Sequence, residues 1–213
     1  MSSLFIPQGR LRFIHPARAA PIHSFRKGGP DSFIHSFIHS FIHSLTSHYK
    51  LRRWQRGDEA SLVKYANNYD IWRNVRDGFP HPYTWENAHE WIKICEREET
   101  ATVLAIEING EAVGGVGIVP QKDIYRKNAE IGYWLGEPFW GRGIMTAAVV
   151  EMCAYAFAHF DIQRLYAGVF EYNIASMHVL KKAGFEQTSV FKKWLFKEGK
   201  FWDNHWFVKE RTK

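Results

Sequence analysis

One segment of this chain constrains its fold more than any other: a strand-like run, a glycine-bearing loop and an apolar helical run follow one another directly. The run at 128–135 reads Asn-Ala-Glu-Ile-Gly-Tyr-Trp-Leu, and the loop at 140–144 reads Trp-Gly-Arg-Gly-Ile. From Ile144 to about Phe160 the only charged residue is Glu151. The first N–H groups of such a helix point outward without partners, and the helix dipole adds about half a positive charge there. This order of elements therefore predicts a pocket that binds phosphate groups.

The composition predicts one soluble domain. A chain of 213 residues with 46% hydrophobic residues can bury one sizeable core. No apolar run approaches the ~20 residues that a membrane-spanning helix needs, so we expect no membrane partner. Cys95 and Cys153 both lie in apolar helical patterns, which favours buried free thiols in a reducing compartment over a disulfide. We therefore expect a cytoplasmic protein.

The net charge of +6 suggests nucleic-acid binding, but the charge is unevenly placed. Residues 1–48 contain five Lys or Arg and a single acid, Asp31. The rest of the chain therefore has 28 − 5 = 23 basic and 22 − 1 = 21 acidic residues, a balance of only +2. A nearly neutral domain offers no basic stripe for a phosphate backbone, so we expect no nucleic-acid partner.

The N-terminal segment 1–48 differs from the rest of the chain. Residues 32–43 repeat Ser-Phe-Ile-His three times, so His35, His39 and His43 would share one side of a helix. Without acidic neighbours this repeat is more typical of low-complexity sequence than of a metal site, and we expect no metal. The arginines and serines also resemble a mitochondrial transit peptide, which would make the protein mitochondrial. We expect 1–48 to be a low-complexity, disordered extension and 49–213 to be the domain. A presequence and a gene-model artefact are the alternatives.

The remaining pattern predicts an α/β fold, with a mixed sheet of about seven strands flanked by helices. Strands are expected at 49–54, 102–108, 111–121, 127–135, 164–169, 186–196 and 200–209. Helices are expected at 58–68, 71–76, 85–98, 143–160 and 174–183, with Asp58 and Thr84 as N-caps. The glycines at 115 and 117 are followed by more strand rather than by a helix, which indicates close packing or a bulge and not a nucleotide-binding loop.

These elements together resemble the GNAT superfamily of acetyl-CoA-dependent N-acetyltransferases, and most closely the branch with the ribosomal-protein N-terminal alanine acetyltransferases. The resemblance covers roughly 49–210. It is carried by the strand 128–135, the loop 140–144, the Asn-x-x-Ser segment at 173–176 ahead of Ala-Gly-Phe at 183–185, and the closing hairpin 197–203. It implies the GNAT-type acyl-CoA N-acyltransferase fold, with acetyl-CoA as co-substrate.

The resemblance also implies which residues bind the coenzyme. The family's pyrophosphate signature, Arg/Gln-x-x-Gly-x-Gly/Ala, falls on Trp140, Gly143 and Met145, so two of its three positions depart from the consensus. Backbone amides supply most contacts there, provided that the Met145 side chain points away from the phosphates. Arg142 is either a phosphate partner or a solvated charge. Asn173 resembles the asparagine that binds the pantetheine arm, with a helix N-cap as the alternative. The expected coenzyme-binding residues are Tyr133, Trp134, Leu135, Trp140, Gly141, Arg142, Gly143, Ile144, Met145, Thr146 and Asn173, and the pantetheine is expected to pair with the backbone of Trp134 and Leu135.

The chemistry requires a neutral amine. At pH 7 only about one lysine-like amine in 2,500 is neutral, which costs ~4.6 kcal/mol, whereas an α-amine of pKa ~7.8 costs about 1 kcal/mol. Glu130, on the strand beside the expected thioester, is the candidate base; a surface carboxylate paired with Arg or Lys is the alternative. Many family members protonate the thiolate with a tyrosine seven residues after the asparagine, but that position is Leu180 here. Ser176 matches the serine proposed for this role in the Rim-type branch, with helix capping as the alternative.

The acceptor pocket is expected from 71–75, from the loop 79–83 and from the closing aromatic hairpin. Candidate substrate-binding residues are Trp72, Asn74, His81, Tyr83, Trp194 and Trp202, each with packing as the alternative. The predicted function is transfer of an acetyl group from acetyl-CoA to a primary amine, either a protein N-terminus or a small amine, by a monomer or homodimer. A catalytically silent acetyl-CoA-binding module and a nucleic-acid-binding protein are the alternative functions.

Overall fold

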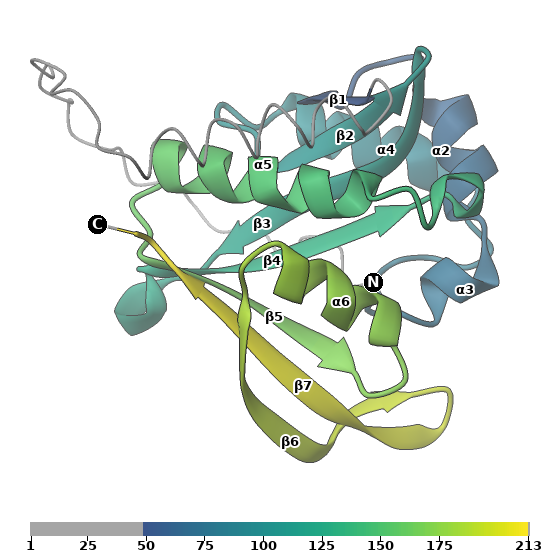
Figure 1. The fold of residues 1–213 in the computed structure, drawn as a ribbon. Coiled ribbons are helices and arrows are strands. Elements are labelled where there is room, and N and C mark those ends of the chain that lie inside the picture. The colour runs from purple at the N-terminus through teal and green to yellow at the C-terminus, as the bar shows by residue number, and fades with distance from the viewer. Residues whose placement is uncertain (1–48, 213) are drawn as a thin grey trace, which may run out of the picture. The chain divides into compact units, whose positions relative to one another are not determined.

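The computed structural model describes residues 49–212 (Figure 1). The predictions for 1–48, including the histidine repeat and the presequence, lie outside these residues. No helix within 49–212 is both long enough and apolar enough to cross a bilayer. In the same range no three His, Cys, Asp or Glu side chains gather as a metal site would require. Cys95 and Cys153 are buried free thiols, as predicted.

Seven strands form one mixed sheet in the order β1-β2-β3-β4-β5-β7-β6. Only β4 and β5 pair in parallel, and every other neighbouring pair is antiparallel. The strands are β1 (Tyr49–Arg53), β2 (Val103–Ile108), β3 (Glu111–Pro120), β4 (Asn128–Leu135), β5 (Arg164–Phe170), β6 (Glu186–Lys197) and β7 (Lys200–Glu210). The predicted mixed seven-stranded sheet is therefore confirmed.

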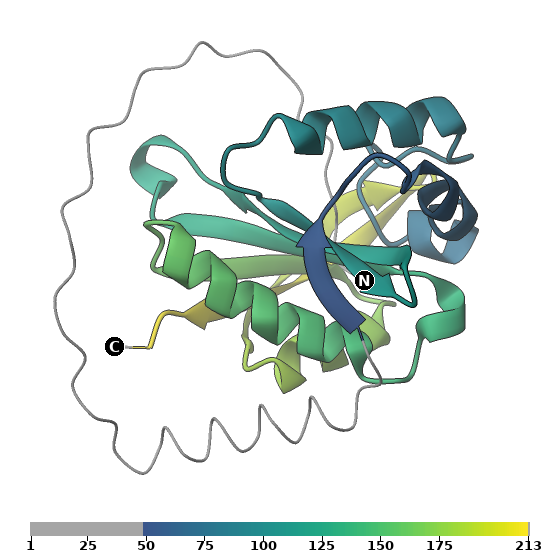
Figure 2. The ribbon, with the colours of Figure 1, turned by 90° about the horizontal axis from the view of Figure 1, so that it is seen from above.

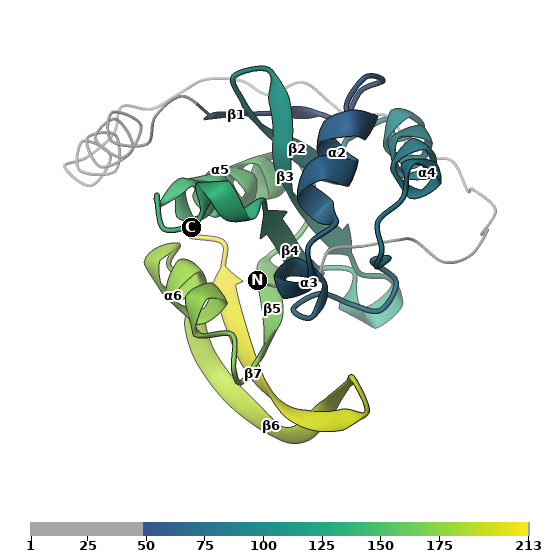
Figure 3. The same ribbon diagram turned by 90° about the vertical axis from the view of Figure 1, so that its right-hand side faces the viewer.

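Helices cover both faces of the sheet. They are α2 (Glu59–Ala66), α3 (Tyr69–Trp72), α4 (Trp85–Glu96), α5 (Ile144–His159) and α6 (Ile174–Lys182), with short 3₁₀ turns at η1 (Asp123–Tyr125) and η2 (Glu137–Phe139). Figure 2 shows α4 and α5 on opposite sides of the sheet, and Figure 3 shows α6 on the same side as α5. The second predicted helix, at 71–76, is shorter and starts earlier than expected, because Asn68 caps it by accepting a hydrogen bond from the Ile71 N–H.

The two predicted N-caps behave differently. Thr84 caps α4 in a reciprocal capping box with Asn87. Asp58 stands at the start of α2 but makes no side-chain cap. Its carboxylate instead accepts two hydrogen bonds of 2.7 Å from the Arg52 guanidinium, and one of 3.0 Å from the Gln55 N–H. Leaving the nearly buried Arg52 guanidinium without a carboxylate would cost more free energy than leaving the N–H groups of the helix end to water. The Asp58 side chain therefore pairs with Arg52 and does not cap the helix.

The glycines of β3 are packing residues, as predicted. A Cβ at Gly117 would stand 2.7 Å from the carbonyl oxygen of Thr102, which is closer than real Cβ atoms come. A Cβ at Gly115 would stand 3.1 Å from the indole nitrogen of Trp134. The register of β2 and β3 also shifts between Ile106 and Glu107, which marks a bulge. Glycine here lets the centre of the sheet pack closely.

The parallel pair β4–β5 positions the functional site. Its register contains only three pairs, Asn128↔Arg164, Ala129↔Leu165 and Glu130↔Tyr166. Beyond them both strands continue, to Leu135 and to Phe170, but no longer pair with each other. A gap therefore opens in the middle of the sheet, with unpaired strand edges on its two sides.

Candidate active site

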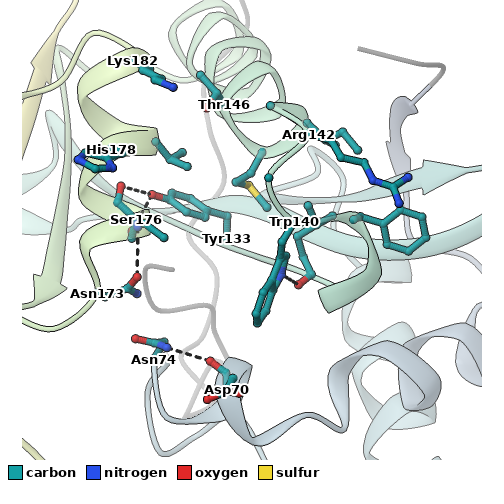
Figure 4. Close-up of a pocket in the computed structure, with 18 residues that line it drawn as sticks. Asp70, Asn74, Tyr133, Trp140, Arg142, Thr146, Asn173, Ser176, His178 and Lys182 are labelled. Atoms are coloured by element: carbon teal, nitrogen blue, oxygen red, sulfur yellow. Dashed lines mark hydrogen bonds between the residues drawn. The ribbon is translucent and has the colours of Figure 1, made fainter.

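A cavity of about 420 Å³ lies on the α5–α6 face, beside the gap between β4 and β5 (Figure 4). Its lining comes from the end of β4, the loop after η2, the first turn of α5, the start of α6 and the α3 segment. We call it the first cavity. Every predicted coenzyme-binding residue except Trp134 lines it, and so do Ser176 and Asn74. Sequence reasoning missed Asp70, Phe139, Ala175, His178, Val179 and Lys182, which also line it.

The loop that ends at α5 has the backbone of an anion site. Gly141 and Gly143 adopt left-handed φ angles of 74° and 75°, which glycine reaches without strain. Gly143 is the N-cap of α5, and no side chain within 49–212 caps that end of the helix. The 16-residue helix α5 therefore presents its first N–H groups, and the positive end of its dipole, on the side of the cavity. Met145, at a consensus glycine position, is 7% exposed and lines the cavity.

Three cationic or titratable side chains also belong to the lining of the cavity. Arg142, His178 and Lys182 all line it and all are exposed. Figure 4 shows Arg142 pointing away from the Tyr133–Ser176 pair. Its guanidinium lies 5.7 Å from the centre of the Phe139 ring and, among the described residues, pairs with no carboxylate. This rim favours a ligand that carries several negative charges.

The direction of the backbone in β4 corrects the expected position of Trp134. A Cβ at Gly114 would lie 2.6 Å from the carbonyl oxygen of Trp134, so this carbonyl points toward β3. Successive carbonyls alternate along a strand, so those of Tyr133 and Leu135 point toward the gap. The Leu135 carbonyl there accepts a 2.6 Å hydrogen bond from the indole N–H of Trp140. The Trp134 ring packs on the other face, stacked on Trp54.

A buried pair of hydroxyl groups lies where α6 meets β4. The Oγ of Ser176 is 2.9 Å from the phenol oxygen of Tyr133, which also donates to the Ser176 carbonyl at 3.3 Å. The Asn173 side chain caps α6 by accepting a 3.1 Å hydrogen bond from the Ser176 N–H, so its N-cap role is confirmed. Leu180, at the position of the missing tyrosine, is fully buried in the core. Tyr133 and Ser176 therefore form a hydrogen-bonded pair of hydroxyl groups on the first-cavity side of the gap.

Glu130 lies on the other face of the sheet. Side chains alternate along a strand, so Glu130 points opposite to Tyr133. It lines a second cavity of about 350 Å³ together with Tyr166, Asn204 and Trp206. The Glu130 side chain is only 13% exposed, and its carboxylate pairs with the Arg76 guanidinium. The alternative interpretation of Glu130, a carboxylate paired with Arg or Lys, predicted such a pair. Burial, and then the nearby Glu130 charge, raise the pKa of Tyr166 to about 12, so that this phenol is neutral at physiological pH.

Most of the predicted acceptor residues contact other rings and line neither cavity. Asn74 lines the first cavity and its Nδ2 donates to the Asp70 carbonyl, while its Oδ1 is buried with no partner among the described residues. Four others line neither cavity: Trp72 and His81 stack at 5.5 Å, Tyr83 packs on Phe79, and Trp202 packs on Tyr172. Burial raises the pKa of Tyr83 above its usual range. Of the aromatic candidates, Trp194 alone lines the second cavity.

Sequence reasoning missed most of the second cavity, which is also lined by Arg76, Asp77, Tyr166, Lys197, Asn204 and Trp206. The alternation of side chains along β5 puts residues 166, 168 and 170 on one face of the sheet. This pattern identifies the cavity only when it is also known that Tyr166 pairs with Glu130, and the sequence does not show that pairing.

A family model for the acetyltransferase (GNAT) domain matches residues 48–186. The chain belongs to the GNAT acetyltransferase family. The SPbeta prophage-derived uncharacterized N-acetyltransferase YokL of Bacillus subtilis is 26% identical over 136 residues, which are 63% of this chain and 75% of that protein. Both the predicted family and its fold are confirmed.

Two solved structures share this GNAT fold. The ribosomal-protein-alanine N-acetyltransferase of Brucella melitensis superposes with a TM-score of 0.64 at 24% identity, over 76% of this chain and 99% of that one. The spermidine N-acetyltransferase of Vibrio cholerae, in complex with CoA and spermine, superposes with a TM-score of 0.65 at 19% identity, over 77% of this chain and 96% of that one.

Proposed function

We propose that this protein is an acetyl-CoA-dependent N-acetyltransferase that acts on a primary amine by direct attack. The observation that carries the proposal is the parting of β4 and β5 after Glu130↔Tyr166, with one cavity on each face of the sheet beside the gap. A thioester in that gap would be held from one face, while the amine approaches from the other. Holding the two reactants together in this way replaces a bimolecular encounter by a positioned one.

The first cavity suits acetyl-CoA. The uncapped start of α5 offers N–H donors, and Arg142, His178 and Lys182 in the lining of the same cavity offer positive charge to the phosphate groups. The edge of β4 offers Tyr133 and Leu135 to the amides of the pantetheine arm. The indole of Trp140 uses one lone pair of the Leu135 carbonyl, and the second remains for a ligand.

The transfer needs one proton acceptor and one proton donor. The amine nitrogen bonds to the thioester carbon, the C–S bond breaks, and the acetyl group ends as an amide. Glu130, oriented by Arg76 in the second cavity, takes the proton that the nitrogen loses, directly or through a water. The Ser176–Tyr133 hydroxyl pair, on the opposite side of the gap, returns a proton to the thiolate.

Two measurements test this function. Purified protein with acetyl-CoA should release free thiol with at least one amine of a panel of ethanolamine, 2-phenylethylamine, spermidine and an alanine-starting peptide. Initial rates should show the intersecting pattern of a ternary complex and not the parallel pattern of an acetyl-enzyme. Calorimetry with CoA at millimolar concentration that shows no heat would refute the proposal. CoA binding without thiol release from any amine would leave a catalytically silent module.

A further inference from the structure

The second cavity continues outward along a row of aromatic rings. Tyr166, the strand partner of Glu130, stacks on Trp206 with ring centres 4.7 Å apart. Trp206 meets Phe191 edge to face at 5.9 Å, and Phe191 lies 5.4 Å from Trp194. Three of these residues line the cavity, and Trp194 is 67% exposed at its outer end. We call these four rings the aromatic strip.

A bulge in β6 puts Trp194 at that end. Phe191 pairs with Asn204 of β7, and Leu195 pairs with Trp202. Three residues of β6, from Lys192 to Trp194, therefore stand opposite the single residue Asp203. Lys193 adopts a left-handed φ of 50° within the bulge. Bulges redirect side chains relative to the regular alternation of a strand, so Trp194 owes its orientation to this irregularity.

Asp203 holds the bulge with both carboxylate oxygens. Its Oδ2 accepts a 2.6 Å hydrogen bond from the Lys192 ammonium, and its Oδ1 accepts one of 2.9 Å from the Lys193 N–H. These two bonds, the Lys192 bond first, keep the pKa of Asp203 below its usual range. The Asp203 backbone is itself fixed to the end of β5 by a reciprocal pair of 3.1 Å hydrogen bonds with Glu171. These contacts anchor the bulge on both sides.

The charges of the cavity limit what the strip can receive. Its two cations are each matched by one carboxylate: Arg76 pairs with Glu130, and Lys197, which is 2% exposed, pairs with Asp77 at 2.7 Å. Among the described residues that line this cavity, no further carboxylate remains to balance the second and third ammonium groups of a polyamine. A hydrophobic group attached close to a single amine would instead lie against the rings with the amine near Glu130.

Building on the acetyltransferase function proposed above, we infer that the acceptor is a primary amine with an apolar group next to it, and that Trp194 selects for this group. Asp203 is a positioning residue that keeps Trp194 over the cavity. The shared chemistry fits an arylalkylamine and also a peptide N-terminus followed by a large apolar residue.

The test compares matched acceptors. Thiol release is measured with 2-phenylethylamine against ethanolamine, and with Ala-Phe amide against Ala-Asp amide, with spermidine as the polyamine. We expect a KM at least about tenfold lower for the apolar member of a pair, since a missing hydrophobic contact costs on that order. Preference confined to the first pair indicates a small amine, and preference extending to the second indicates a peptide. Equal KM values within both pairs, or the lowest KM for spermidine, would overturn the inference.

Variants separate selection from stability. Trp194→Ala should raise the KM for 2-phenylethylamine about tenfold while kcat and the KM for ethanolamine change less than twofold. Trp85→Ala, which removes another exposed tryptophan at the start of α4, is the control and should change neither KM. Asp203→Ala should act like Trp194→Ala, and Asp203→Asn, which can still accept from Lys193, should act more weakly. An equal KM change for both amines in the Asp203 variants would contradict its positioning role.

Binding supplies a readout that does not depend on turnover. Calorimetry in the presence of CoA should give a tighter Kd for 2-phenylethylamine than for ethanolamine, and Trp194→Ala should remove the difference. If no amine releases thiol, the proposed function fails. The difference in Kd between the two amines then still tests whether the aromatic strip binds an apolar group. Identical Kd values in the native protein would refute the strip whatever the outcome of the thiol assay.

Discussion

Replacing Ser176 by alanine tests the proton donor most directly. The Oγ of Ser176 is buried and lies 2.9 Å from the Tyr133 hydroxyl. The cap of α6 does not depend on this hydroxyl, because Asn173 accepts from the Ser176 backbone N–H. Tyr133 also keeps its 3.3 Å hydrogen bond to the Ser176 carbonyl. The variant therefore loses the neutral buried hydrogen bond between Ser176 Oγ and Tyr133, and such a bond contributes about 1 kcal/mol to the free energy of unfolding.

The expected effects on stability and on catalysis differ in size. A loss of about 1 kcal/mol lowers the melting temperature of a domain of this length by roughly 2–4 °C. If the hydroxyl pair protonates the departing thiolate, kcat should fall about tenfold or more, equivalent to at least about 1.4 kcal/mol in the barrier. The Kd of CoA should stay within about twofold. Once the pH exceeds the pKa of the coenzyme thiol, the released thiolate needs no proton, so the deficit in kcat should shrink at the alkaline end of the pH profile.

Ser61→Ala is the matched control. Ser61 is also a buried helical serine, and its Oγ donates a 3.0 Å hydrogen bond to the Asp58 carbonyl, remote from both cavities. It should lower the melting temperature by a similar amount and leave kcat unchanged. Tyr133→Phe should reduce kcat as Ser176→Ala does, and the double variant should be no slower than either, since both remove one relay. A Ser176→Ala protein that turns over as fast as Ser61→Ala would refute the proton-donor role.

Three further predictions concern the base, the acid stability and the close packing of the sheet. Glu130→Gln should lower kcat while leaving the Kd of CoA within about twofold, and unchanged rates across pH 6–9 would remove Glu130 from the mechanism. The Lys50 and Arg52 side chains lower the pKa of Glu107, so its stabilisation is complete above pH ~4.3 and is lost as the pH falls through its folded-state pKa. Glu107→Gln should therefore flatten the rise of melting temperature between pH 3 and 6, and an unaltered curve would contradict this. Gly117→Ala, whose Cβ would meet the Thr102 carbonyl at 2.7 Å, should destabilise by about 1–3 kcal/mol, as chemical denaturation would measure; native stability would contradict the clash.

Most of the first cavity was predictable because its main elements, apart from the α3 segment, follow one another in sequence. The strand, the glycine loop and α5 follow one another between 128 and 159, and Asn173 and Ser176 stand on the first turn of the next helix. Local periodicity and helix-start chemistry are enough to place such a site. The direction of a backbone carbonyl cannot be predicted in this way. Whether the Trp134 carbonyl points to β3 or to the gap depends on the register between two strands, which the sequence of one strand does not determine.

The second cavity depends on contacts between distant parts of the chain. The partner of Glu130 is Arg76, 54 residues earlier, and the partner of Lys197 is Asp77, 120 residues earlier. Aromatic residues near the expected acceptor site gave an ambiguous signal, because rings serve packing and binding alike. Tyr83 was a candidate on this basis and is 5% exposed in the core, whereas Tyr166 and Trp206 were not candidates and line the cavity.

The arrangement of the two cavities bears on the order of the chemical steps. An acetyl-enzyme would need a nucleophile that reaches the thioester, but Cys95 and Cys153 are both buried and line neither cavity. Burial also raises the pKa of each thiol, which disfavours the reactive thiolate. Tyr133 and Ser176 face the first cavity, the same side as the expected coenzyme, and they are engaged with each other. In the proposed function the amine attacks from the second cavity, across the gap from the coenzyme, and the parting of β4 and β5 favours this direct transfer because it opens a path between the two faces.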